Sequence, residues 1–150
     1  FDEIWGDNMV KFNSENMTEA LDRFGKQYKY PIYASIRNMA TGFFSRPSDA
    51  ISGYAAVTDD NFLILVQIPV FGTINDAEYF QLPVLGIKKL KLKKTAILNA
   101  YTVDIRGVAD GKKYGFRIVT VSKVGGKGFP EQPANHAGFI EKLKRWSDEL

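Results

Sequence analysis

Two segments of the chain repeat their apolar residues at the spacing of an amphipathic helix. The first follows Ser14, whose side chain can cap a helix start, and stops at Gly25. The second begins at Ala134 or Asn135 and carries charged residues on its other side. The apolar positions are Met17, Ala20, Leu21 and Phe24 in the first segment, and Phe139, Ile140, Leu143 and Trp146 in the second. Residues 1–12 have no clear period, and we expect them to be irregular.

Between these helices the pattern changes to that of β-strands, with Gly, Pro, Asp and Asn separating the runs. The predicted strands are 30–41, 53–58, 62–68, 78–82, a lysine-rich strand 87–94, 101–106 and 112–121, with loops at 43–52, 69–76 and 124–133. Asp110-Gly111 predicts a tight hairpin, because both central residues of that turn need a positive φ. Asp59-Asp60-Asn61 predicts a second tight turn.

Two of the predicted strands carry further information. Residues 62–68 are apolar at nearly every position, so we expect a strand that is buried on both faces or covered by a helix on its outer face. In the lysine-rich strand the apolar residues change from odd-numbered to even-numbered positions, which face opposite sides of a strand. The odd-numbered residues are Leu85 and Ile87, and the even-numbered residues are Leu90 and Leu92. A β-bulge near Lys88-Lys89 accounts for the switch.

The order of elements, a helix, seven short strands and a helix, predicts a mainly β protein with flanking helices. So many strand edges favour closure over an open sheet. We therefore expect a seven-stranded bent barrel or sandwich that is capped by the C-terminal amphipathic helix, with the N-terminal helix as an addition. Residues 1–29 form the N-terminal arm and helix, and residues 30–150 form the barrel with its helix, in a single globular unit. A chain of 150 residues can close such a core without metals or disulfides.

Composition narrows the class of protein only a little. The chain is 45% hydrophobic and 25% charged, as ordinary globular proteins are, and has no cysteine, which excludes a disulfide scaffold, a cysteine nucleophile and a thiolate metal site. Its longest apolar run, 62–71, is much shorter than the roughly 20 residues that span a bilayer. We expect a cytoplasmic protein that can associate with a membrane surface. The start at Phe1 leaves open whether a targeting signal precedes it.

One stretch resembles a known family. Residues 54–65, YAAVTDDNFLIL, are similar to a hairpin of bacterial pleckstrin-homology-like domains, close to the GRAM type. The lysine-rich strand, the strand at 101–105, the segment 111–118 and the closing helix follow in that family's order. The resemblance covers residues 30–150 and leaves the first helix as an addition. It implies a seven-stranded bent barrel capped by a C-terminal helix.

The resemblance also bears on function. Eukaryotic members that hold phosphoinositides carry a basic Lys-x-Lys/Arg-x-Arg pattern from the first strand into the second. Here Arg37 and Arg46 are the only basic residues between Ile32 and Phe62, a departure that argues against a specific phosphoinositide pocket. Many bacterial relatives are interaction or assembly modules, and the resemblance implies a role of that kind.

The lysine-rich strand is the sharpest candidate for a binding site. The candidate anion-binding or partner-binding residues are Lys88, Lys89, Lys91, Lys93 and Lys94. If Lys89, Lys91 and Lys93 share the outer face, they form a basic stripe that can meet anionic lipid or nucleic-acid phosphate. The alternative, which the sequence alone favours, is that lysines keep a strand soluble and stop it from pairing with another chain.

Three phenylalanines in predicted loops are a second candidate. Phe43, Phe44 and Phe71 fall outside the strands, where exposed apolar groups can contact a membrane or a protein partner. The alternative is that these loops fold back over an end of the barrel and bury the rings.

Other motifs favour structural roles. Gly125-Gly126-Lys127-Gly128 lacks the Ser or Thr that a phosphate-binding loop places after its lysine, and is interpreted as a flexible connection. His136, the single histidine, is expected to be a surface or capping residue at a helix start. Asp59 and Asp60 fit a turn better than a calcium site or an acid/base pair. The segment Tyr114-Gly115-Phe116 shares only its aromatic-Gly-aromatic pattern with the platforms on which some proteins bind RNA.

These observations favour a non-enzymatic binding or assembly module that works through protein contacts, self-association or weak contact with anionic membranes. No catalytic residue, cofactor or metal is predicted. One alternative is a barrel that binds a small ligand, or an enzyme of unfamiliar type that uses the barrel interior. A further alternative is non-specific nucleic-acid binding through the lysine-rich strand.

Overall fold

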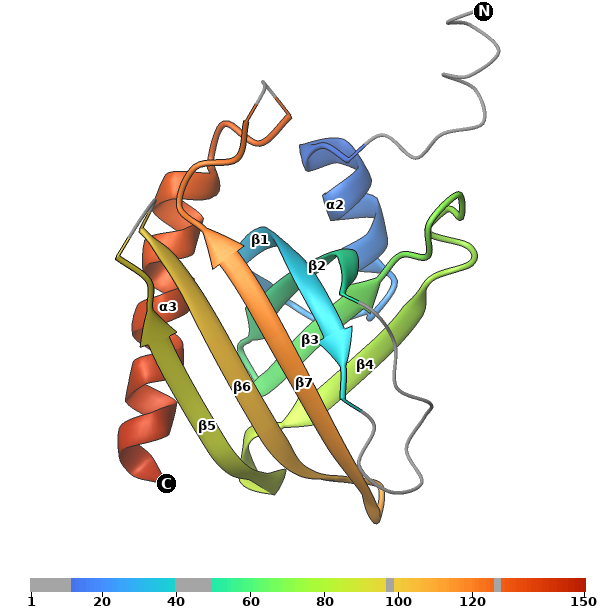
Figure 1. Ribbon diagram of the computed structural model, residues 1–150. Helices are drawn as coiled ribbons and strands as arrows, with labels where there is room; N and C mark the ends of the chain where they lie inside the picture. Colours follow the sequence, from blue (N-terminus) through green and yellow to red (C-terminus); the bar gives the residue numbers. More distant parts are fainter. Residues whose placement is uncertain (1–11, 40–49, 97–98, 126–127) are drawn as a thin grey trace, which may run out of the picture.

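The computed structural model describes residues 12–39, 50–96, 99–125 and 128–150. Its helices and strands follow one another largely in the order that the sequence predicts (Figure 1). The elements are α2 (Ser14–Asp22), β1 (Tyr28–Asn38), β2 (Ile51–Thr58), β3 (Phe62–Gln67), β4 (Glu78–Pro83), the 3₁₀ turn η1 (Val84–Gly86), β5 (Ile87–Lys94), β6 (Ala100–Ala109), β7 (Lys112–Val121) and α3 (Gln132–Glu149).

All seven strands form one antiparallel sheet in the order β4-β3-β2-β1-β7-β6-β5. The sheet bends on itself, so that β5, β6 and β7 lie in front of β2, β3 and β4 in Figure 1, and β4 contacts β6. α3 packs against β1 and β5 along one side of the bent sheet. The predicted mainly β fold with seven strands and two flanking helices is therefore confirmed.

The larger core fills the space between the two halves of the sheet and α3. The helix contributes the predicted apolar stripe, since Phe139, Ile140, Leu143 and Trp146 are all buried. From the sheet, Phe80 and Phe116 meet with ring centroids 4.8 Å apart. The helix begins at Gln132, earlier than predicted, because Pro133 is tolerated in the first helical turn, where a backbone N–H would have no partner within the helix.

A second core lies on the outer face of β2 and β3, where α2 covers it. Met17, Ala20 and Leu21 of this helix pack there with residues of both strands. This cover explains why β3 is apolar at nearly every position, as the sequence predicts. The cap of α2 differs from the expectation: Asn13, not Ser14, accepts the hydrogen bond from the Asn16 N–H at 2.7 Å.

The Asp110-Gly111 hairpin is confirmed. Both residues have positive φ, 53° and 76°, and Ala109 pairs directly with Lys112 on either side of the turn. The turn after β2 is confirmed too, with Asn61 at a φ of 64°.

The parity switch in β5 is confirmed as an irregularity of register. Ile87 pairs with Gly107 of β6, but Lys89 pairs with Arg106, so Lys88 is the extra residue. Leu85 departs from the expected inward parity, because it lies in η1 and is 97% exposed.

β1 contains a second irregularity, which the sequence did not predict. Its register shifts between Lys29 and Ile32, and Tyr30 has a φ of 56°. Tyr30 is 36% exposed. Its ring lies against Gly138 of α3, where a Cβ would come within 2.2 Å of a ring carbon. Glycine at this helical position allows the close approach.

Candidate functional site

The lysines of β5 lie on an exposed strand at one end of the sheet order. Lys89, Lys91 and Lys93 share the outer face, where they stand opposite Arg106, Asp104 and Thr102 of β6. The other two candidates lie apart from this stripe, although both are exposed. Lys88 is the bulge residue, and Lys94 pairs with Tyr101, whose side chain points into the core.

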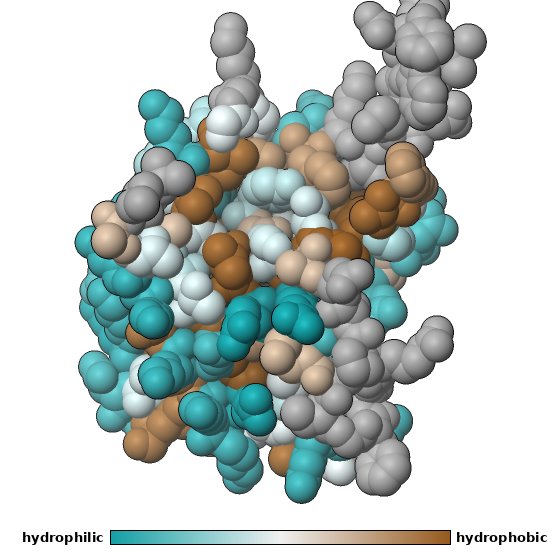
Figure 2. Space-filling model, in the orientation of Figure 1, coloured by the Kyte–Doolittle hydropathy of each residue, from teal (hydrophilic) through white to brown (hydrophobic). Residues whose placement is uncertain are grey.

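The positive charge continues across the neighbouring strands, which the sequence analysis missed. The register places seven exposed cations on one face of β5, β6, β7 and β1, and we call this set the basic face. Its residues are Lys89, Lys91, Lys93, Arg106, Lys113, Arg117 and Arg37. Hydrophilic side chains gather over the same strands in Figure 2. Among the outward residues of these strands that the structure describes, Asp104 is the single carboxylate.

Like charges stand directly opposite one another on this face. Lys89 pairs with Arg106 across β5 and β6, and Arg37 pairs with Arg117 across β1 and β7. Directly opposed like charges destabilise a sheet. Asp104 offsets only part of this repulsion. It accepts a hydrogen bond of 2.8 Å from Arg117 Nε, and this bond raises the pKa of the Arg117 guanidinium.

A small hollow lies at the centre of the basic face. It encloses about 170 Å³, and four cations surround it. Lys89 and Lys91 line it from β5, Arg106 and Asp104 from β6, and Arg117 from β7. The face therefore offers convergent donors to a negatively charged surface without a deep pocket.

The aromatic loop candidates have separate outcomes. Phe71 is exposed, as the interpretation of a contact with a membrane or protein partner requires. Its neighbour Val70 is exposed as well, and the sequence analysis did not single it out. Phe43 and Phe44 lie outside the described residues.

His136 is buried, which corrects the expectation of a surface or capping residue. Only 2% of it is exposed, and its ring lies 5.9 Å from the ring of Tyr101. Its Nε2 has no hydrogen-bond partner in the part of the chain that the structure describes. Burial lowers the pKa of the imidazole, and a hydrogen bond with the Thr120 backbone opposes this shift. The helical spacing could have revealed this burial, since His136 lies three and four positions before Phe139 and Ile140 of the buried stripe.

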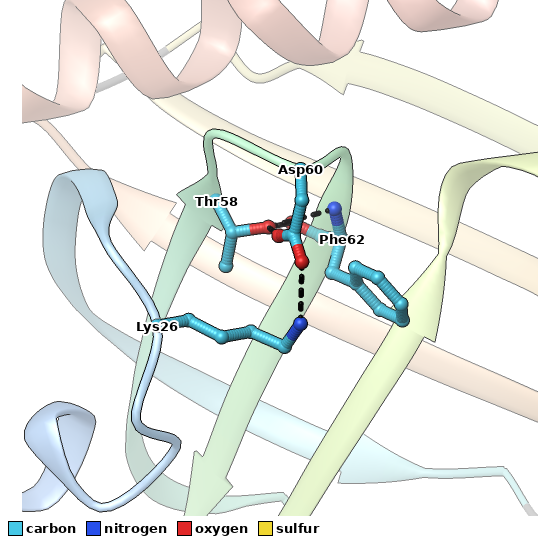
Figure 3. Close-up of polar contacts among 4 residues, drawn as sticks. All are labelled: Lys26, Thr58, Asp60 and Phe62. Atoms are coloured by element: carbon cyan, nitrogen blue, oxygen red, sulfur yellow. Dashed lines mark hydrogen bonds and ion pairs between the residues drawn. The ribbon is translucent and has the colours of Figure 1, made fainter.

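The Asp59-Asp60 pair serves the turn that the sequence predicts. Asp60 accepts hydrogen bonds from Thr58 and, at 2.6 Å, from Lys26 Nζ (Figure 3). Lys26 Nζ also lies 4.0 Å above the centre of the Phe62 ring. The bonds from Lys26 and Thr58 lower the pKa of Asp60. Within the described residues there is no group of three or more His, Cys, Asp or Glu placed to hold a metal.

Two remaining motifs are also placed. Tyr114 and Phe116 are about 1% exposed, so they cannot serve as a platform on which RNA bases stack. Burial raises the pKa of Tyr114 to about 12. The Gly125–Gly128 connection falls partly outside the described residues, at 126–127.

Comparison with known proteins adds no family to this picture. No protein-family model, curated protein or solved structure matches the chain. Among the helices that the structure describes, none is long and apolar enough to cross a membrane.

Proposed function

We propose that this protein is a binding module of pleckstrin-homology-like architecture, and that its basic face attaches it weakly to anionic membrane surfaces. The proposal of architecture is supported by the antiparallel order of seven strands and by the C-terminal helix that packs on the sheet. The proposal of function is supported by the basic face, and it involves binding rather than catalysis.

One observation carries this function: the cations continue on strands that are not edges of the sheet. Lysines on β5 can be explained by the need to keep an edge strand from pairing with another chain. That explanation does not extend to β6, β7 and β1, which have partners on both sides. These strands carry Arg106, Arg117 and Arg37. Arg106 stands opposite Lys89, and Arg37 stands opposite Arg117. The single carboxylate, Asp104, stands opposite Arg117 on its other side. A binding role accounts for charges that folding does not need.

The expected attraction is weak for each residue and useful in sum. A lysine or arginine near an anionic bilayer gains about 1 kcal/mol, and this gain decreases as salt screens the charges. Seven cations with one carboxylate therefore support reversible attachment, provided that most of them reach the surface together. An acidic protein surface or a nucleic acid offers similar charges, so the test must separate the three partners.

Co-sedimentation with vesicles tests the proposal. We expect the protein to pellet with vesicles that contain phosphatidylserine, not with pure phosphatidylcholine, and to be released by salt. The variant Lys89→Glu, Lys91→Glu, Lys93→Glu should remain folded and lose most of this binding. Pelleting with neither vesicle contradicts membrane attachment. Salt-sensitive retardation of duplex DNA in the absence of vesicle binding would favour the nucleic-acid alternative.

A further inference from the structure

The hollow in the basic face lies among β5, β6 and β7, the three strands that run side by side at the front of Figure 1. Two neighbouring rows of outward residues cross these strands there, Lys89-Arg106-Gly115 and Lys91-Asp104-Arg117. Gly115 has no side chain, so no group from β7 stands beside Arg106 in its row. The missing side chain leaves space among the four cations that line the hollow.

The charge of this hollow is largely uncompensated. Its one carboxylate, Asp104, accepts the 2.8 Å hydrogen bond from Arg117 Nε. Within the described residues, the other three cations of the lining have no ion-pair partner. Residues 40–49, which follow the lining residue Met39, contain one arginine and one aspartate, so they add no net negative charge. A bound anion would supply the counter-charge that these parts of the chain do not.

The size of the hollow and its donors indicate which anion fits. Its volume of about 170 Å³ is below the roughly 300 Å³ of the smallest sites that hold a whole small molecule, so it admits one compact group. A phosphate monoester carries about −1.5 to −2 charges at neutral pH and offers three acceptor oxygens, whereas a phosphodiester or a carboxylate carries a single charge. Arg106 and Arg117 present guanidinium groups, which can each donate two parallel hydrogen bonds to phosphate.

We propose that the hollow binds the phosphate group of a membrane lipid whose headgroup is a phosphate monoester, such as phosphatidic acid. This inference rests on the proposed attachment of the basic face to anionic membranes. The other cations of that face, Lys93, Lys113 and Arg37, lie on the same surface, where they can meet neighbouring anionic headgroups. Charges spread over four strands fit a bilayer better than a phosphorylated peptide, which contacts a narrower track.

Vesicles that differ only in their anionic lipid test this assignment. Phosphatidic acid vesicles and phosphatidylserine vesicles are prepared with the same zeta potential, so that the general attraction of the basic face is equal for both. We expect the wild type to bind the phosphatidic acid vesicles about tenfold more tightly, a gain within reach of one or two hydrogen bonds between charged groups. Equal binding to both overturns this inference and leaves the proposed membrane attachment intact, whereas binding to neither overturns both.

The variant Arg106→Lys separates geometry from charge. Lysine keeps the positive charge but lacks the planar pair of donors, so the variant should bind phosphatidylserine vesicles as the wild type does and lose most of its preference for phosphatidic acid. Arg37→Lys is the matched control, because Arg37 lies on the basic face but is not among the described residues that line the hollow. Loss of the preference in both variants, or in neither, contradicts the hollow as the phosphate site.

The variant Asp104→Asn should have the opposite effect. It removes the one carboxylate of the hollow and releases Arg117 Nε for the ligand, so the affinity for phosphatidic acid vesicles should rise severalfold. Asp148→Asn makes the same change of charge at an exposed position on α3 and should raise the affinity less. An affinity that Asp104→Asn leaves unchanged or lowers, in a variant whose melting temperature matches that of the wild type, would overturn the proposal.

Competition by a soluble phosphate monoester identifies the source of the ligand. Glycerol phosphate should displace the wild type from phosphatidic acid vesicles more effectively than sodium chloride does at the same ionic strength, and Arg106→Lys should reduce this difference. Equal displacement by the two salts contradicts recognition of the phosphate group. Binding of glycerol phosphate or of a phosphorylated peptide, with no preference between the two kinds of vesicle, would assign the hollow to a soluble partner and overturn the lipid assignment.

Discussion

At the scale of single residues, His136 is the one whose chemistry conflicts most with its surroundings. It is the only histidine in the chain, it is 2% exposed, and its Nε2 lacks a hydrogen-bond partner within the described part of the structure. A protonated ring at this position would bring an uncompensated charge into the contact between α3 and the sheet. Burial accordingly lowers the pKa of His136 below its ordinary value of 6.5.

This shift predicts a pH dependence of stability. Between the folded and unfolded pKa values the unfolded chain binds a proton that the folded chain does not bind, so stability rises with pH. The contribution of His136 is complete above about pH 6.5 and is lost as the pH falls from there through the folded pKa. We expect the urea concentration at the midpoint of unfolding to be lower at pH 5.5 than at pH 7.5. These two pH values lie on either side of the ordinary histidine pKa of roughly 6.5.

A single substitution isolates the effect. His136→Gln should unfold at nearly the same urea concentration at both pH values, because no other histidine titrates in this window. An equal loss of stability in the variant and in the wild type would show that carboxylates, and not His136, cause the dependence.

At the scale of elements, Gln132 fixes the first turn of α3 to two strands. Its side-chain nitrogen donates to the Tyr33 and Val121 carbonyls at 3.1 and 3.0 Å, and its oxygen accepts from the Tyr33 N–H at 3.0 Å. These bonds connect α3 to β1 and β7, the two strands whose pairing brings Arg37 and Arg117 together on the basic face. The position of the helix therefore depends on one buried amide as well as on the apolar stripe.

Gln132→Leu should destabilise the protein by about 2–4 kcal/mol, because it leaves several buried backbone groups without this partner. Urea unfolding at pH 7.5 measures the change. Glu141→Gln on the exposed side of the same helix is the control, and it should cost less than about 0.5 kcal/mol, since its ion pair with Arg145 is exposed to solvent. Similar losses for both variants would contradict a special role for Gln132.

The elements also show which features a sequence can reveal. The bulge at Lys88 and the Asp110-Gly111 turn are local, and residues close in sequence determine them. The irregularity at Tyr30 is different, because the ring packs against Gly138, more than a hundred positions away. Pattern alone cannot predict a strand distortion that depends on a distant helix.

At the scale of the whole molecule, the sequence predicted the elements but not the surfaces that they form. Alternation indicated the mainly β class. A stretch that is apolar at nearly every position predicted a strand that is buried on both faces or covered by a helix, and α2 does cover β3. The basic face escaped prediction because it depends on register: Arg37 and Arg117 are neighbours only because β1 pairs with β7.

The arginines on the inner strands provide the sharpest test of membrane attachment. Arg37 and Arg106 have no ion-pair partner among the described residues, and each stands opposite another cation. The double variant Arg37→Gln, Arg106→Gln should therefore fold as well as the wild type. A control with the same change of charge is Lys29→Gln, Lys123→Gln, at two exposed positions outside the basic face.

The decisive measurement is the partition of these variants into phosphatidylserine vesicles at low salt. We predict that the arginine variant binds tenfold or more weakly, since two cations contribute about 2 kcal/mol near an anionic surface, and that the lysine control binds nearly as the wild type does. Equal binding by the wild type and both variants, or an equal loss in both variants, would contradict the assignment of membrane attachment to the basic face.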